Sequence, residues 1–188
     1  PRSVGDYRRV IDDPEIDAVY IPLPNSMHHA WTLAAAEAGK HVLCEKPLGI
    51  NKSEIEAVQT SRAGATGFLQ VGFNRRFAPL SISAKQKLSS LEGPRFITFR
   101  VNAGAVPAGS WLHNMAEGGG RIIGEMCHFI DLARHFSKSK ITTVQASSAR
   151  NLNKTSDDIT ANLQFEDGSL ATIAYTSLGD PSFPKERY

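Results

Sequence analysis

Three short apolar runs alternate with two segments of helical pattern in the first part of the chain, and this order constrains the fold more than any other feature. The runs cover residues 16–23, 41–44 and 68–73, and the helical segments cover 26–38 and 54–63. Near-continuous apolar strands are typical of a parallel sheet covered on both faces. The order therefore predicts half of a Rossmann-type, doubly wound α/β sheet.

Polar residues and glycines mark the predicted ends of these helices. Ser26 is expected to cap the first helix, which ends at Gly39, and either Asn51 or Ser53 is expected to cap the second. The Gly-x-Gly-x-x-Gly motif, which cradles the phosphates of a dinucleotide, does not occur in the 188 residues. We therefore expect the chain to be a fragment whose phosphate-binding half lies upstream of Pro1.

The pattern changes after Phe77. The predicted elements are, in chain order, a helix over 80–91, a strand over 95–102, an irregular stretch over 103–120, a helix over 122–136 and strands over 142–149, 159–165 and 171–177. Asp167-Gly168 between the last two strands is a strong hairpin signal. We expect a partial dinucleotide-binding domain over 1–77 and, over 78–188, an α+β domain with a mostly antiparallel open sheet that is incomplete at its C-terminus.

Composition argues against several classes of protein. A formal net charge of +2 without runs of Lys and Arg gives no case for a nucleic acid or an acidic membrane as partner. No apolar run approaches the roughly 20 residues of a membrane span, and no signal peptide is expected. Cys44 and Cys127 are expected to be reduced thiols, since a disulfide would require them to be adjacent in space. A cytoplasmic protein is the expectation.

The most informative motif is the segment 39–47, Gly-Lys-His-Val-Leu-Cys-Glu-Lys-Pro. It places Glu45, Lys46 and Pro47 just beyond a predicted strand, where open α/β sheets bind their ligands. An ammonium at this place could hydrogen-bond a substrate hydroxyl and stabilise charge that develops on its oxygen. Desolvation or positive neighbours could also prepare it for proton transfer. The alternative is a solvated charged loop.

Other polar or aromatic residues follow the predicted strands. Pro24, Asn25 and His28 come directly after the first strand, where they either form a simple turn and helix start or face the ligand crevice. Asn74 follows the third strand. Trp111 lies in the irregular stretch, where packing is the alternative to contact with a ligand.

A glycine run at 118–120 precedes the helix predicted over 122–136, which carries several polar residues on one face. Glycines let a backbone approach a ligand closely, and Glu125, His128 and Asp131 share one face of the expected helix through their i, i+3 spacing. These three could be metal ligands, but no partner cluster of His or Cys exists elsewhere, so no metal is expected. His128 is the best general acid/base candidate because its unperturbed pKa lies near neutrality.

These motifs together resemble the Gfo/Idh/MocA family (glucose–fructose oxidoreductase, inositol dehydrogenase, rhizopine catabolism) of nicotinamide-dependent sugar oxidoreductases, and the resemblance covers nearly the whole chain. It implies catalysis by Lys46, His128 and Glu125, and a cis bond between Lys46 and Pro47. It implies NAD or NADP as cofactor, bound by Pro24, Asn25, His28, Glu45, Lys46, Pro47, Asn74 and Trp111.

One position departs from the family pattern. Relatives commonly carry Asp at the place of Gly124, together with the acid/base His at the place of His128. Glu125 would then supply the carboxylate from a shifted register, or the site works without it. If the resemblance holds, Lys46 and His128 converge on one cleft.

The implied reaction is hydride exchange between NAD(P) and a secondary alcohol of a sugar, sugar nucleotide or cyclitol. The implied partners are a small carbohydrate-like substrate and further copies of the chain, joined through the C-terminal sheet. Two alternatives remain open. One is a glycoside hydrolase of the same fold that uses NAD transiently, and the other is a non-catalytic sugar- or dinucleotide-binding protein, which the glycine at position 124 favours.

Overall fold

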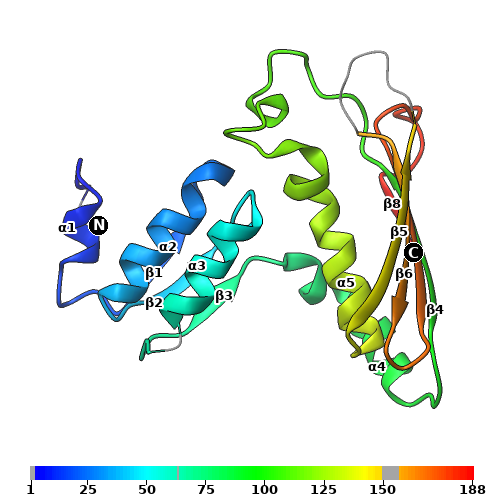
Figure 1. Cartoon of the computed structure of the whole chain (residues 1–188), viewed down its shortest axis with the longest axis horizontal. Helices are drawn as coiled ribbons and strands as arrows, with labels where there is room; N and C mark the ends of the chain where they lie inside the picture. The colour runs from blue at the N-terminus through cyan, green and yellow to red at the C-terminus, as the bar shows by residue number, and fades with distance from the viewer. Residues whose placement is uncertain (1–2, 63, 150–156) are drawn as a thin grey trace. The chain divides into compact units, whose positions relative to one another are not determined.

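The computed structural model describes residues 3–62, 64–149 and 157–188. The chain divides into two compact units (Figure 1). Unit 1 consists of Pro1–Gly72 with Asn114–Gly119, and unit 2 consists of Phe73–His113 with Gly120–Tyr188. The division at Gly72 lies a few residues before Phe77, and the glycine run is shared between the two units.

Unit 1 is built around a small parallel sheet with the strand order β1-β2-β3. Its elements are α1 Arg8–Ile11, β1 Ala18–Ile21, the 3-10 turn η1 Asn25–Met27, α2 His28–Glu37, β2 His41–Cys44, α3 Lys52–Arg62 and β3 Leu69–Val71. The order strand, helix, strand, helix, strand predicted from the apolar runs is confirmed. The core of this unit contains Ile21, Ala35, Val42 and Cys44, with Trp31 packed against it.

The two main helices of unit 1 begin in different ways. Asn51 Oδ1 accepts a hydrogen bond from the Glu54 N–H at 3.0 Å, and Glu54 Oε2 accepts one from the Ile50 N–H at 2.7 Å. This reciprocal pattern selects Asn51 rather than Ser53 as the cap of α3. The predicted Ser26 cap of α2 is wrong, because the chain enters α2 through a 3-10 turn without a side-chain cap. Position 63, predicted to end α3, lies outside the described residues.

Unit 2 combines helices with a five-stranded sheet. Its elements are η2 Asn74–Phe77, α4 Pro79–Ser89, β4 Phe96–Asn102, η3 Trp111–His113, a π-helical turn Ile122–Met126 (η4), α5 Cys127–Ser137, β5 Ile141–Ser148, β6 Ile159–Phe165, β7 Leu170–Thr176 and β8 Glu186–Arg187. The predicted hairpin of β6 and β7 is confirmed by their antiparallel pairing.

The sheet of unit 2 has the order β5-β6-β7-β4-β8 and is mixed, because β4 runs parallel to β7. Residues of β4, β6 and β7 alternate between buried and exposed, and α5 covers the buried face (Figure 1). Phe99, Phe129, Leu132 and Ile173 are fully buried between the two layers. This burial of large apolar side chains, about 1.5–3 kcal/mol each, is what holds α5 on the sheet.

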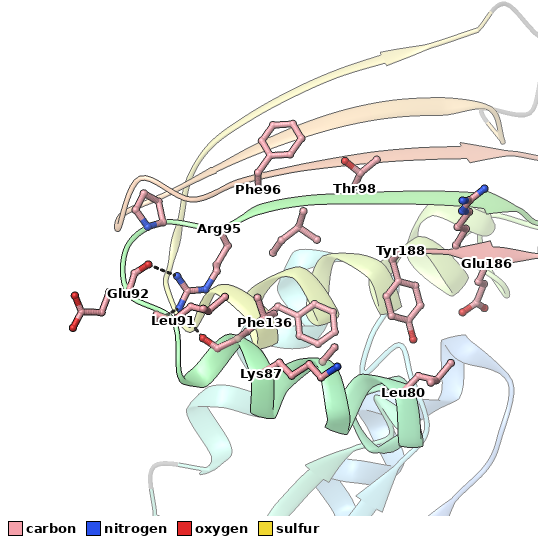
Figure 2. A pocket seen from close by; sticks show the side chains of 15 residues that line it. Leu80, Lys87, Leu91, Glu92, Arg95, Phe96, Thr98, Phe136, Glu186 and Tyr188 are labelled. Atoms are coloured by element: carbon pink, nitrogen blue, oxygen red, sulfur yellow. Dashed lines mark hydrogen bonds between the residues drawn. The ribbon is translucent and has the colours of Figure 1, made fainter.

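A hollow of about 980 Å³ lies between α4 and β4 of unit 2 (Figure 2). The Arg95 guanidinium closes one end of it by donating hydrogen bonds to the carbonyls of Leu88 and Leu91 in the last turn of α4 and the loop that follows. The lining is largely apolar and includes Phe136 and Tyr188. None of the predicted site residues lines this hollow, so its size alone does not identify the functional site.

Within the described ranges, no helix has the length and apolar character that crossing a membrane requires.

Candidate active site

The carboxyl ends of the three strands of unit 1 meet at one edge of the sheet. The register aligns Ile21 with Cys44, and Cys44 with Val71. Because the strands are parallel, the residues that follow each of them emerge at the same edge. The segment 22–24, the segment 45–47 and Gly72 are therefore neighbours there.

A buried histidine holds the turn that carries Lys46. The Lys46–Pro47 bond is cis, as the resemblance implied. His28 is 1% exposed, and its Nδ1 lies 2.7 Å from the Pro47 carbonyl oxygen. A carbonyl only accepts hydrogen bonds, so Nδ1 carries the proton and donates it. Because His28 is buried, its ring supports this turn and is not accessible to a ligand in this structure.

Glu45 is fixed by groups from all three strand ends. Its Oε1 accepts a hydrogen bond from the Tyr20 hydroxyl at 3.0 Å, and its Oε2 accepts one from the Lys46 N–H at 3.3 Å. This hydrogen bond to Glu45 is the main cause that raises the pKa of Tyr20. A Cβ at Gly72 would lie 3.0 Å from Glu45 Oε2, so a side chain there would displace the carboxylate. The backbone before Lys46 is thus held by β1, β2 and the end of β3.

Asn25 connects this edge to the glycine run. Its Nδ2 donates a hydrogen bond to the Gly118 carbonyl at 2.8 Å, and the backbone N–H of Ser26 donates one to the Glu117 carbonyl at 2.9 Å. Gly119 and Gly120 both have positive φ, +71° and +76°, which residues with a side chain rarely adopt. The glycines are needed for this backbone path, and Asn25, which is buried, holds its beginning.

Glu125 is fully occupied by partners within unit 2. Its carboxylate accepts hydrogen bonds from the Tyr175 hydroxyl at 2.6 Å and from Arg121 at 2.8 Å, and Lys185 Nζ lies 2.5 Å from it. Burial alone would raise the pKa of Glu125, but hydrogen bonds from Lys185, Tyr175 and Arg121 outweigh it and lower the pKa to about 2. A carboxyl group with this pKa remains ionised near neutral pH and is poorly suited to exchange protons there.

The π-helical turn explains why Glu125, His128 and Asp131 do not act as one set. Glu125 lies within the turn, whereas His128 and Asp131 lie on α5, so the regular i, i+3 spacing does not extend to Glu125. His128 is 3% exposed and makes an edge-to-face contact with Phe73 at 6.0 Å between ring centroids. Asp131 accepts a hydrogen bond from Arg76 Nε at 2.6 Å. Each side chain therefore has its own partners.

The predicted site residues divide between the two units. Unit 1 contains Pro24, Asn25, His28, Glu45, Lys46 and Pro47, and unit 2 contains Asn74, Trp111, Glu125 and His128. Within unit 1 the structure brings His28, Glu45, Lys46 and Pro47 together. In unit 2, Asn74 begins η2 and Trp111 begins η3, and both are exposed. The convergence of Lys46 and His128 stays a prediction.

The sequence did not reveal the role of several residues around these sites. Tyr20 and Gly72 orient Glu45, while Arg121, Tyr175 and Lys185 bind Glu125. Only the i, i+4 spacing of Arg121 and Glu125 gave a local signal for any of these pairs. No group of three or more His, Cys, Asp or Glu side chains arranged to hold a metal occurs in residues 3–62, 64–149 and 157–188.

The histidine support gives a testable expectation for stability. We expect His28→Ala to lower the free energy of unfolding by about 2 kcal/mol, because the buried Pro47 carbonyl loses its donor and a cavity remains. Urea denaturation of the two chains measures this difference. The matched control is His29→Ala, whose more exposed ring lies 3.3 Å from Glu54 and should contribute less than about 1 kcal/mol. Equal losses for both variants would contradict the proposed support.

Two family models match the chain. The model described as an oxidoreductase family with an NAD-binding Rossmann fold matches residues 2–73, and the model of the GFO/IDH/MocA C-terminal domain matches residues 93–183. The two matches correspond largely to unit 1 and unit 2.

Curated relatives and solved structures agree with these matches. An uncharacterized oxidoreductase of Bacillus subtilis, YrbE, is 34% identical over 90% of this chain and 51% of its own length. The scyllo-inositol 2-dehydrogenase (NAD(+)) of Bacillus subtilis is 36% identical over 74% of this chain and 40% of its own length. A structure of levoglucosan dehydrogenase in complex with NADH and levoglucosan is 28% identical, with a TM-score of 0.83 over 95% of this chain and 52% of the other. The chain thus spans about half the length of these proteins, or less.

Proposed function

Because the chain belongs to the GFO/IDH/MocA family of oxidoreductases with an NAD-binding Rossmann domain, we propose that it transfers a hydride between NAD or NADP and a secondary alcohol. The substrate class that we propose is a sugar, sugar nucleotide or cyclitol. The observation that supports this most directly is the Lys46 turn, which is held by Glu45 on one side and by His28 through Pro47 on the other. Two of the similar proteins named above are dehydrogenases, one of scyllo-inositol and one of levoglucosan.

The residues of unit 1 suit one end of the cofactor. Pro22, Leu23 and Pro24 are exposed at the edge of the sheet, and Lys46 beside them is half-buried, which offers an apolar surface next to a cation. The sequence holds no Gly-x-Gly-x-x-Gly turn for the phosphates, so the fit concerns the nicotinamide and its ribose. When bound, the nicotinamide accepts or donates the hydride.

We propose distinct roles for the remaining residues. Lys46 hydrogen-bonds the alcohol oxygen and stabilises the charge that develops on it, and His128 accepts or returns the hydroxyl proton. His28 positions the backbone beside Lys46 and Asn25 positions the start of the glycine run, because both side chains are buried and bonded to carbonyl oxygens. Glu125 positions Arg121, Tyr175 and Lys185, since these partners occupy its carboxylate.

A dehydrogenase screen tests this proposal. The full-length protein is incubated with panels of inositols, sugars and sugar nucleotides, with NAD and NADP in turn, while the nicotinamide absorbance is followed. Substrate-dependent reduction supports the proposal. Release of a sugar product without a change in absorbance would instead identify a hydrolase that cycles NAD, and binding without turnover would identify a non-catalytic protein.

We also propose that copies of the chain associate through the outward face of the unit 2 sheet. Phe96 and Leu170 are cross-strand neighbours on this face, and both are exposed. Burial of such an apolar pair in a second copy is favourable. We expect Phe96→Glu to reduce the mass measured by light scattering toward that of one chain. Gln59→Glu, a change at an exposed position of α3 in unit 1, should leave the mass unaltered.

A further inference from the structure

Unit 2 contains a second hollow, of about 610 Å³, whose lining is strongly basic. We call it the basic recess and define it by its lining residues Arg76, Lys85, Arg134, His135, Lys138, Ser139, Lys140 and Glu166. They come from η2, from α4, from the last turn of α5 and the residues that follow it, and from the turn between β6 and β7. Several separate segments thus bring five Lys and Arg side chains to one place.

The described residues around the basic recess balance its positive charge only in part. Arg76 is paired with Asp131, and Glu166 is the one carboxylate of the lining. Among the carboxylates of residues 3–62, 64–149 and 157–188, none forms a salt bridge with Lys85, Arg134, Lys138 or Lys140. The recess therefore keeps a surplus of cations.

The C-terminus of α5 offsets only part of this positive charge. Cations stabilise the C-terminus of a helix, and Lys85 Nζ donates a hydrogen bond to the His135 carbonyl there. The helix dipole supplies the equivalent of about half a negative charge at this end. This is less than the summed positive charge of Lys85, Arg134, Lys138 and Lys140, the four cations without a described carboxylate partner. Burial lowers the pKa of Lys85, and repulsion from Lys138, Arg76 and Arg95 lowers it further. An anion bound among these side chains would relieve the repulsion at Lys85.

We propose that the basic recess binds a phosphorylated small molecule through its phosphate group. Lys and Arg side chains are the usual partners of phosphate. The Ser139 hydroxyl lies in the same lining, where it accepts a hydrogen bond from the Asp167 N–H and also interacts with the Asp167 carboxylate. The volume lies within the range of about 300–1,000 Å³ that is typical of small-molecule sites. None of the residues proposed for hydride transfer lines this recess, so the inference does not depend on the proposed function.

The test is a titration of the full chain with inorganic phosphate and, separately, with pyrophosphate. Isothermal titration calorimetry measures the affinity, and NMR of the backbone amides locates the binding site. We expect saturable binding with shifts at Ser139 and Lys140. The double variant Arg134→Gln with Lys140→Gln changes two exposed side chains and should weaken binding at least about tenfold, because each cation makes a charge-assisted hydrogen bond. Lys85→Gln should weaken it as well.

Three controls separate this site from general charge effects. Lys52→Gln removes an exposed lysine of unit 1, which is paired with Glu56, and should leave the affinity unchanged. The same titration is repeated with sodium chloride at equal ionic strength. If sodium chloride causes the same heat and the same amide shifts as phosphate, the effect is screening alone and the proposal is overturned. Binding to anionic phospholipid vesicles without binding of soluble phosphate would also overturn it, since the phosphate would then belong to a membrane surface.

Discussion

Replacing Lys46 by methionine is expected to lower kcat/KM of the full-length protein at least about a hundredfold. Methionine keeps most of the length of the side chain but removes the ammonium that hydrogen-bonds the alcohol oxygen, and groups of this kind contribute about 10²–10³-fold to a reaction. The affinity for NAD(P) should change far less, because the ammonium acts on the substrate oxygen. Steady-state kinetics with the substrate found in the screen, together with cofactor titration, measure both effects.

The matched control for this variant is Lys52→Met, which removes an exposed lysine of α3 that is paired with Glu56. Its kinetics should remain close to those of the unchanged protein. Near-normal turnover of Lys46→Met would show that Lys46 is structural. If the substitution instead weakened cofactor binding and turnover equally, Lys46 would serve the cofactor rather than the alcohol.

Glu125→Gln is expected to cause the largest loss of stability, about 3 kcal/mol. The substitution keeps the shape of the side chain but leaves Arg121, which is 4% exposed, without its carboxylate partner. Removal of one partner from a buried ion pair typically costs about 3–5 kcal/mol. Urea denaturation at neutral pH measures the loss, and Glu56→Gln, at an exposed ion pair of α3, should change the stability by less than about 1 kcal/mol.

The same carboxylate predicts how stability depends on pH. The pKa of Glu125 falls from 4.5 to about 2 in the folded chain, so its contribution is complete above about pH 4.5 and disappears as the pH falls toward 2. The free energy of unfolding should therefore decline less steeply between pH 4.5 and pH 2 in Glu125→Gln. Lowered pKa values of Asp158 and Asp167 leave part of the decline in place. Identical slopes for the two chains would show that Glu125 is not the carboxylate responsible.

The elements of unit 1 could be predicted because their signals are local. The apolar run His41–Cys44 became β2 with the predicted bounds, and Gly39 before it has the positive φ of +74° expected of a glycine after a helix. The turn at Asp167-Gly168 likewise joins β6 and β7 as predicted. In each case neighbouring residues carry the information, since side-chain alternation and backbone freedom act over a few positions.

The features that escaped prediction depend on residues far apart in the chain. β8 has two residues, too few for any periodicity, and forms because it pairs with β4. The same holds for the partners of Glu125, since Tyr175 and Lys185 reach it only after the sheet has formed.

The sequence by itself determined the order of strands and helices, the Lys46 motif at the end of a strand and the resemblance to a family. Only the tertiary structure decided that His28 holds Pro47, that Glu125 is occupied by two cations and a tyrosine, and that separate segments form a basic recess. The physical reason is that periodicity records how each segment meets its nearest layer. Hydrogen bonds and ion pairs between segments require positions that only the folded chain provides.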